Sequence, residues 1–276
     1  MLERALSSLH VSTTTSPPPS LPLSSATIFT TDTLDGWLQP ESSLAKGLMV
    51  KRPSNGRWDA CQPFIDEAIK RFGRSRGIST QCLNGDPAHL REQVGIILEK
   101  AALPAELSEQ ISCDACNLGA ALGSLCSYSR VLEIKLEVCA SLSPSTSPPS
   151  SCTRVLASAQ LPCTAVQVFG ENACNRWHRD NYGGRAIVSY TGAIGTQYTS
   201  DENVDFWELE HCGVNEHIIH DVSQIYAAEV GDLFFMKGMQ YPAGAKGLIH
   251  KSPEVRFHAD GRVVNRLVLK LDVPRE

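Results

Sequence analysis

The sequence contains no long hydrophobic run and no excess of basic side chains. None of its apolar stretches reaches the roughly 18 residues of a membrane-spanning helix, so we expect no membrane segment. Its 25 Lys and Arg residues are outnumbered by 30 Asp and Glu residues, which gives a formal net charge of −5. Because nucleic-acid binding usually needs a basic surface, we expect no nucleic-acid partner.

Several common catalytic motifs are also missing. The sequence has no Gly-x-Ser-x-Gly, no P-loop and no Gly-x-Gly-x-x-Gly. Its ten cysteines are even in number, but they are irregularly spaced in a chain that is not small. Reduced thiols in an intracellular protein are therefore expected, with the cytoplasm as the simplest location. Organelle targeting by the Ser/Thr-rich N-terminus stays open, although Glu3 and a single early Arg make that signal weak.

Composition divides the chain into three regions. Residues 7–28 are a low-complexity run of Ser, Thr and Pro, which buries too little to offset its ordering entropy, so residues 1–30 are predicted to be a disordered tail. Residues 31–128 are predicted to be a helical lead-in. Apolar residues recur at helical spacing in 58–73 and 86–103, and the second of these begins with Asp86 as N-cap and Pro87 at the first helical position.

From residue 129 onward the pattern changes to that of strands. Residues 131–138 alternate apolar with charged side chains, which predicts a strand with one wet face. Further strands are predicted at 164–170, 185–191, 196–199, 226–229, 232–237 and 263–273. The fold class is therefore α+β, with helices followed by an antiparallel sandwich or barrel over 129–276.

The stretch NRWHRDNYGG holds His178 and Asp180 with one residue between them. In an extended segment, residues i and i+2 point to the same face, so both side chains can reach one metal ion. A second His-x-Asp, at His258 and Asp260, is explained by the Asp-Gly turn that follows it. The third ligand that such a site needs is predicted to be His250, which follows the strand GDLFFMKG.

An arginine in an apolar strand suggests an anion-binding group. Arg266 lies among apolar residues of the last strand, and a buried guanidinium needs an anionic partner. This partner is either an acidic side chain, such as Asp272 or Glu229, or the carboxylate of a bound molecule. Arg262, beside the Asp-Gly turn, is held in reserve.

The order His178-x-Asp180, His250 and Arg266 resembles that of the Fe(II)/2-oxoglutarate-dependent oxygenases. The words CNRWHRDNYGGRAIVSYTGAIGTQY, GDLFFMKG, GLIHKSP and NRLVLKLD resemble more closely the DUF1826 family of uncharacterised proteins, over roughly the C-terminal 110 residues. The oxygenase resemblance implies a double-stranded β-helix (a jelly-roll, cupin-like core).

The same resemblance implies the chemistry of the site. His178, Asp180 and His250 would hold Fe(II), and Arg266 would bind the far carboxylate of 2-oxoglutarate. Arg185, just after the His-x-Asp, is a further candidate for that carboxylate. Tyr190, on the same strand, either lines the pocket or is an ordinary core aromatic. The substrate, a small molecule or a protein, is not indicated.

Three rival interpretations remain open, the last of which is a degenerate jelly roll with a purely structural role. The first is a zinc site built from His211, Cys212, His217 and His220, to which Cys113 and Cys116 add a possible half-site; Cys174 lies four residues before His178. No standard zinc spacing is completed, and structural thiols are the better explanation for the small-residue run around Cys113. The second rival is a cupin-like metal-binding protein without catalysis, acting in metal homeostasis or sensing.

Overall fold

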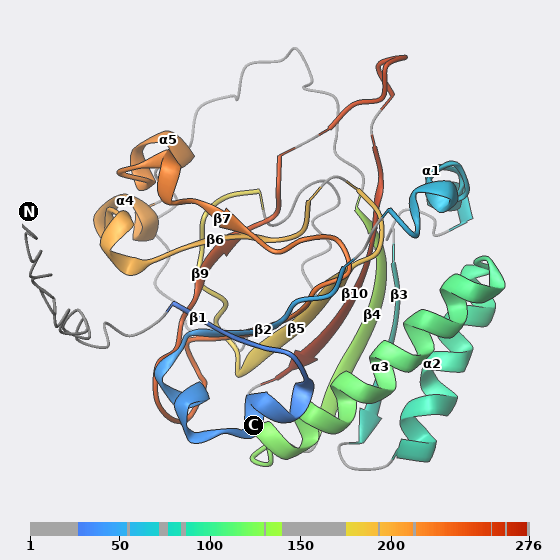
Figure 1. Cartoon of the computed structure of the whole chain (residues 1–276), viewed down its shortest axis with the longest axis horizontal. Coiled ribbons are helices and arrows are strands. Elements are labelled where there is room, and N and C mark those ends of the chain that lie inside the picture. Colours follow the sequence, from blue (N-terminus) through green and yellow to red (C-terminus); the bar gives the residue numbers. More distant parts are fainter. Residues whose placement is uncertain are drawn as a thin grey trace, which may run out of the picture.

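The computed structural model describes residues 27–53, 56–71, 77–83, 87–129, 131–139, 175–192, 194–211, 214–254, 256–262 and 264–274. Within this part of the chain, helices cover one face of a large sheet, and a smaller sheet lies on its other side (Figure 1). None of the described helices is both long and apolar enough to cross a lipid bilayer. The α+β class predicted from the sequence is confirmed.

The large sheet has seven strands. All neighbours in it pair antiparallel except the first two, which are parallel. From one edge to the other, the strands are β1 (Ile28–Thr31), β2 (Gly47–Val50), β8 (Leu233–Lys237), β5 (Gly184–Ser189), β10 (Arg266–Val273), β4 (Val131–Cys139) and β3 (Gly77–Leu83).

The small sheet has three strands, in the order β7 (Tyr226–Ala227), β6 (Gln197–Thr199) and β9 (Ile249–Lys251). Beyond β9, an isolated antiparallel bridge joins His178 to His250. From β4 to β10 the chain therefore passes repeatedly between the two sheets: β4, the His178 bridge, β5, then β6 and β7, then β8, β9 and β10.

The helices lie mostly in the N-terminal half. The α-helices are α1 (Gln62–Arg71), α2 (Pro87–Ala101), α3 (Ala105–Leu125), α4 (Phe206–Glu210) and α5 (Asn215–Ile218). Short 3₁₀ helices are η1 (Leu34–Leu38), η2 (Pro40–Leu44), η3 (Asp59–Cys61), η4 (Asp201–Asn203) and η5 (Val222–Gln224). Helices α2 and α3 pack closely because Gly119 leaves room for Leu90, whose Cδ2 would lie 2.2 Å from a Cβ at residue 119.

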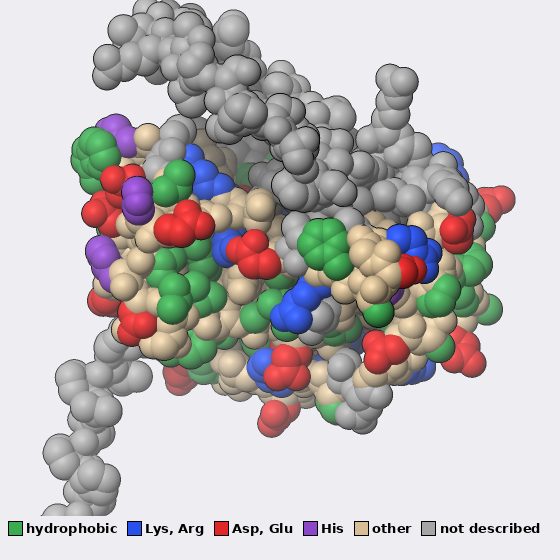
Figure 2. Space-filling model, turned by 90° about the horizontal axis from the view of Figure 1, so that it is seen from above, with side chains coloured by type: hydrophobic (Ala, Val, Ile, Leu, Met, Phe, Trp, Pro, Cys, Tyr) green, Lys and Arg blue, Asp and Glu red, His purple; other side chains and the backbone are tan. Residues whose placement is uncertain are grey.

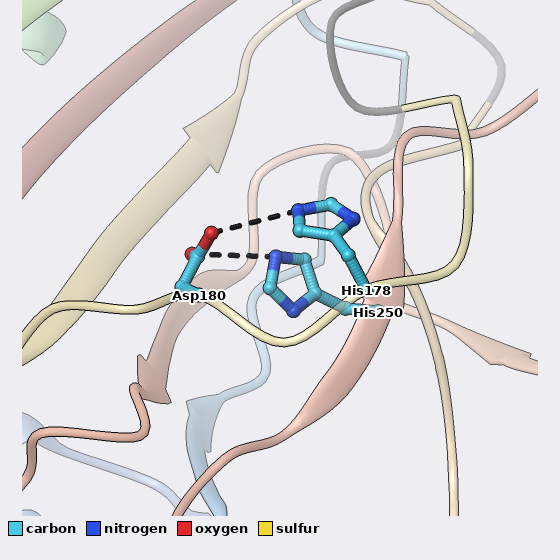
Figure 3. A group of neighbouring side chains, drawn as sticks. All are labelled: His178, Asp180 and His250. Atoms are coloured by element: carbon cyan, nitrogen blue, oxygen red, sulfur yellow. Dashed lines mark ion pairs between the residues drawn. The ribbon is translucent and has the colours of Figure 1, made fainter. Parts of the chain in front are cut away.

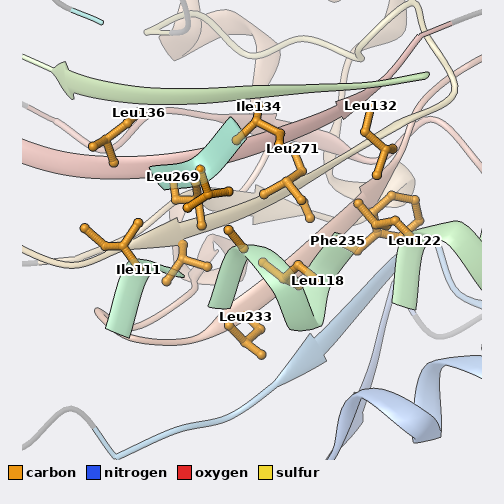
Figure 4. Packing of buried hydrophobic residues seen from close by; sticks show 14 of the residues in the cluster. Ile111, Leu118, Leu122, Leu132, Ile134, Leu136, Leu233, Phe235, Leu269 and Leu271 are labelled. Atoms are coloured by element: carbon orange, nitrogen blue, oxygen red, sulfur yellow. The ribbon is translucent and has the colours of Figure 1, made fainter. Parts of the chain in front are cut away.

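Strand alternation separates two apolar cores. On β10, Leu267, Leu269 and Leu271 face the helices and pack with residues of α3 in the main core (Figure 4). Val268 faces the other way and belongs to a second cluster with residues of β2, β5 and β8. This cluster lies between the two sheets, since Tyr198 of β6 contacts Phe234 of β8 with ring centroids 5.4 Å apart.

The structure agrees with most of the predicted elements and corrects others. The helices predicted at 58–73 and 86–103 appear as α1 and α2, and the alternating strand at 131–138 is β4. The strand predicted at 164–170 and most of the predicted tail lie outside the described residues.

The lead-in at 31–128 is not only helical. It supplies β2 and β3 to the large sheet, and β1 begins at Ile28, inside the predicted tail. The four residues of β2 are all buried, so this strand lacks the alternation that would have marked it in the sequence.

Candidate metal centre

Three side chains predicted to be ligands converge on one point, as Figure 3 shows. One ligand atom from each of His178, Asp180 and His250 lies within 4.8 Å of the others. The Nε2 atom of His178 is 3.5 Å from Oδ1 of Asp180, and the Nε2 atom of His250 is 3.4 Å from Oδ2 of Asp180. It is the only such group of His, Cys, Asp and Glu side chains found among the described residues.

The backbone brings the two histidines together. His178 and His250 are partners in the isolated bridge, and each backbone N–H donates to the carbonyl of the other at 3.0 Å. Side chains that face each other in an antiparallel pair project to the same side, so the imidazoles lie with centroids 4.4 Å apart. Asp180 follows His178 by two residues, and its carboxylate is directed toward both rings (Figure 3).

Backbone carbonyls fix the tautomer of both rings. Nδ1 of His178 lies 2.7 Å from the carbonyl of Arg176, and Nδ1 of His250 lies 3.0 Å from that of Leu248. A carbonyl only accepts, so Nδ1 carries the proton in each ring and Nε2 carries the lone pair. This arrangement, with one nitrogen held by a carbonyl and the other directed to a common point, is typical of metal-binding histidines.

Asp180 is a buried carboxylate, with 8% of its surface exposed. Its Oδ2 atom is fully enclosed and accepts no hydrogen bond within the described part of the chain. Burial raises the pKa of Asp180, but the charge of Arg185 and the contacts with His250 and His178 outweigh it and hold the pKa well below its usual range. The carboxylate is therefore ionised, as a metal ligand must be.

Arg185 supports Asp180 instead of facing open space. Its guanidinium binds Asp272 of β10 through Nε–Oδ1 at 2.5 Å and Nη2–Oδ2 at 2.9 Å, and its Nη1 lies 3.7 Å from Oδ2 of Asp180. The ring of Tyr182 lies under the guanidinium, 5.0 Å from its centroid to Cζ. Asp272, considered as a partner for Arg266, thus pairs with Arg185.

Arg266 lies on the inner face of β10, the face directed to the small sheet. Arg266, Val268 and Asp272 are an even number of residues apart, so their side chains lie on the same face of β10. Arg266 is six residues, about 20 Å, from Asp272 along the strand. Its Nη1 atom is enclosed and makes no hydrogen bond to the described residues. A small pocket beside it is lined by Gly192, Ile194, Pro253, Glu254, Arg256, Val264 and Arg266.

Gly192 makes room for the side chain of Arg266. Its φ is +104°, in the region that favours glycine, and a Cβ here would lie 2.6 Å from Cγ of Arg266. Gly192 therefore leaves space for the side chain of Arg266 beside this pocket.

The structure does not bring Arg262 or Tyr190 to the three ligands. Arg262 is exposed at the Asp-Gly turn, where its Nε binds Asp260 at 2.7 Å. Tyr190 lies on the opposite face of the large sheet, in the main core, and its hydroxyl donates to Asp114 of α3 at 2.8 Å. The strand parity explains this: Arg185 and Ile187 face inward, so Tyr190 faces outward.

The described residues of the rival zinc sites do not form a group of metal ligands. His211, His217 and His220 are exposed around α4 and α5, and α5 ends at Ile218, before His220. Cys113 and Cys116 lie on α3 as free thiols. Cys174 and Cys212 lie outside the described residues.

Sequence reasoning missed two residues of the site, Tyr182 and Trp177. The hydroxyl of Tyr182 is enclosed, and burial raises its pKa well above the usual value. Trp177 is 1% exposed and packs with Ile249 behind the two histidines. The alternation around His178 was the available signal, since residue 177 must face away from a ligand at 178.

Comparison with known proteins gives a family for the C-terminal part of the chain. The fold and the site define an α+β protein with two sheets and a His-Asp-His group between distant segments. Residues 154–272 match the family model described as "Protein of unknown function (DUF1826)", so this part is a DUF1826 domain, as the sequence resemblance suggested. No curated protein matches the sequence.

Two solved structures of plant oxygenases are similar to the chain at low scores. The dioxygenase for auxin oxidation 1 from Arabidopsis thaliana, in a binary complex with 2-oxoglutarate, has 7% identity and a TM-score of 0.44, covering 91% of this chain and 93% of that one. The dioxygenase for auxin oxidation from rice has 10% identity and a TM-score of 0.39, covering 83% and 73%.

Proposed function

We propose that this chain is an Fe(II)- and 2-oxoglutarate-dependent oxygenase. The observation that carries the proposal is the convergence of His178, Asp180 and His250. Two imidazoles and one carboxylate form the set that holds non-haem Fe(II) with positions open for other ligands. When bound, the iron would supply the activation of dioxygen for oxidation of a substrate, with 2-oxoglutarate as the co-reductant.

The donor atoms fit a metal of this kind. Ligands at about 2.1 Å from an ion and at right angles to each other lie about 3 Å apart, close to the two Nε2–Oδ distances of 3.5 and 3.4 Å. The enclosed Oδ2 of Asp180 makes no hydrogen bond in the described part of the chain, although Arg185 and His250 lie near it, and an ion would satisfy it.

The surrounding residues would orient the ligands. The carbonyls of Arg176 and Leu248 hold both rings in the Nε2 lone-pair form. Arg185 keeps Asp180 ionised and, through Asp272, links it to β10. The side chain of His178 is 29% exposed, whereas that of His250 is 4% exposed, so the site opens on the side of His178.

Arg266 is the proposed anchor for the far carboxylate of 2-oxoglutarate. Its position on the inner face and its enclosed Nη1 support this role. Arg185 is a weaker candidate, because Asp272 already occupies its guanidinium fork.

The finer fold that we propose is a double-stranded β-helix. Its support is the order of strands: β4, β10, β5 and β8 are consecutive in the large sheet, and the His178 segment, β9, β6 and β7 are consecutive in the small one. Eight segments that pass between two antiparallel sheets in this way are the pattern of a jelly roll.

The decisive experiment is anaerobic loading of the full chain with Fe(II), followed by air and measurement of succinate with and without 2-oxoglutarate. Succinate is expected only when both are present. The variant His178→Ala should lose it, and His258→Ala, which removes the histidine of the other His-x-Asp, should retain it.

Other outcomes would identify the rivals. Binding of iron and 2-oxoglutarate without any succinate would indicate a binding protein without catalysis. Tight zinc binding that survives His178→Ala would indicate a thiolate or surface-histidine site.

A further inference from the structure

The surface formed by α4 and α5 lies against the segment that carries the first ligand. Arg176 donates through Nη2 to the carbonyl of Leu209 at 2.7 Å, and Arg179 binds Oε1 of Glu210 at 2.7 Å. The backbone N–H of Trp177 donates to Oδ1 of Asn215 at the start of α5. Both short helices are thus fixed to the residues on either side of His178.

An aromatic platform projects from this surface. Trp207 is 65% exposed, although a side chain of this size is usually mostly buried. Its ring stacks on that of His211 one turn later, at 4.7 Å and 16°. Much of the indole is therefore open to solvent, and Val214, 53% exposed, is the N-cap residue that precedes α5. An ordered, exposed tryptophan is the residue type that most often anchors a binding partner.

The charge around this platform is mainly acidic, although Arg179 pairs with Glu210 and Lys46 pairs with Asp201. Residues 201–221 contain seven Asp and Glu residues and no Lys or Arg. Figure 2 shows acidic and histidine side chains with apolar ones at the left end of the molecule, the end that α4 and α5 occupy in Figure 1. Carboxylates around an open indole face favour a cation, which gains both Coulomb attraction and a cation–π contact.

We propose that the surface of Trp207, His211, Val214 and Glu216 docks a Lys- or Arg-rich segment of a protein, which presents a neighbouring side chain to the site at His178. This inference rests on the proposed function and names its substrate class. An acidic surface disfavours nucleic acid and anionic lipid, and a second copy of a chain with net charge −5 is a poor partner for it.

The test measures binding without turnover. Fluorescence anisotropy with a labelled 12-residue peptide of alternating Lys and Ser is carried out on the metal-free full chain. We expect binding that weakens with salt, and no binding of the matched Glu/Ser peptide. Trp207→Ala should lower the affinity about tenfold, and Glu216→Lys severalfold. Two exposed controls should leave it unchanged: Phe257→Ala on the 256–262 hairpin and Glu99→Lys on α2.

The outcomes separate this inference from the proposed function. Binding retained in His178→Ala, together with failure of the succinate assay, would support the docking surface and remove the oxygenase. If succinate forms but Trp207→Ala binds the Lys/Ser peptide with unchanged affinity, the docking surface alone is overturned. The same conclusion follows if the control variants lose as much affinity, or if the Glu/Ser peptide binds equally well. Sedimentation could also show that the unmodified chain is a dimer and that Trp207→Ala is a monomer. The Trp207 surface would then bind a second copy of the chain, and the proposed docking of a basic segment would be overturned.

Discussion

Arg185 and Asp272 form a two-point ion pair across β5 and β10, directly behind the proposed carboxylate ligand. Both side chains are largely buried, at 12% and 8% exposed. The pair explains why an arginine that follows the His-x-Asp by only five residues is not available to a bound molecule. It also links the geometry of Asp180 to the last strand of the sheet.

Loss of this pair should destabilise the fold. Asp272→Asn leaves a buried guanidinium with an incomplete partner, so the free energy of unfolding is expected to fall by about 3 kcal/mol. Urea denaturation at neutral pH measures it. Asp260→Asn, which removes the carboxylate of the exposed pair with Arg262, should leave the midpoint unchanged. Equal midpoints for the two variants would contradict the structural role of the buried pair.

Gly192→Ala should weaken 2-oxoglutarate binding. The new methyl group would meet Cγ of Arg266 and displace its guanidinium, and the positive φ adds strain of about 1 kcal/mol. Gly261→Ala is the matched control, since Gly261 has a φ of +81° but nothing within 4 Å of a Cβ. Calorimetric titration of the Fe(II)-loaded proteins should show weaker binding only for Gly192→Ala. Weaker binding in neither variant would remove Arg266 from the cosubstrate site.

Tyr190 should matter for stability and not for metal binding. Tyr190→Phe removes a hydrogen bond to the buried, charged Asp114 and should cost about 2 kcal/mol in unfolding free energy. Tyr226→Phe, at an exposed position, is the control. Iron content after anaerobic loading should be the same in both. A loss of iron in Tyr190→Phe alone would place Tyr190 in the site after all.

Lys237 should contribute a rise in stability between pH 8 and pH 10. Burial lowers its pKa from 10.5 to about 8, and its Nζ donates to the carbonyl of Ser42 at 2.7 Å beside Tyr241 and Cys126. In this range the unfolded chain binds the proton and the folded chain does not, so raising the pH favours folding, by at most about 3 kcal/mol.

The variant Lys237→Met should abolish that rise and gain stability at pH 7, where the native lysine is charged and buried. Lys246→Met, at an exposed position, should retain the rise. Urea midpoints at a series of pH values measure both. Above pH 9 the rise should be offset, because burial raises the pKa of Cys126 from 9.0 to about 11 and only the unfolded chain then ionises this thiol. Above pH 10 the trend should reverse, because burial raises the pKa of Tyr241 in the same way.

The sequence was sufficient for the elements with strong periodicity and for the three ligands. The helices α1 and α2 and the strand β4 follow from apolar spacing alone. His178 and Asp180 are on one face because of the two-residue period of an extended segment. His250 was chosen as the histidine that follows the predicted strand GDLFFMKG. The convergence of these three groups is a property of the strand order, which local patterns do not encode.

The sequence was not sufficient for pairings that depend on partners far along the chain. Nothing local distinguishes Arg185 from Arg266 as the partner of Asp272, since all three face inward and only the register of β5 on β10 decides. Strands β1 and β2 were missed because four-residue strands carry too little pattern. Tyr190 is five residues from Arg185, so the two side chains face opposite sides of β5. Which of them faces the site could be assigned only once the inner face of β5 was known.

The bridge between His178 and His250 has a thermodynamic consequence. These residues are 72 positions apart, and an ion shared by their rings would close that loop as a covalent staple does, while binding poorly to the unfolded chain. By mass action, an ion at one hundred times its dissociation constant would add about 2.7 kcal/mol to the folded state. A chelator added to the loaded protein should therefore behave as a mild denaturant, lowering the melting temperature before any turnover is measured.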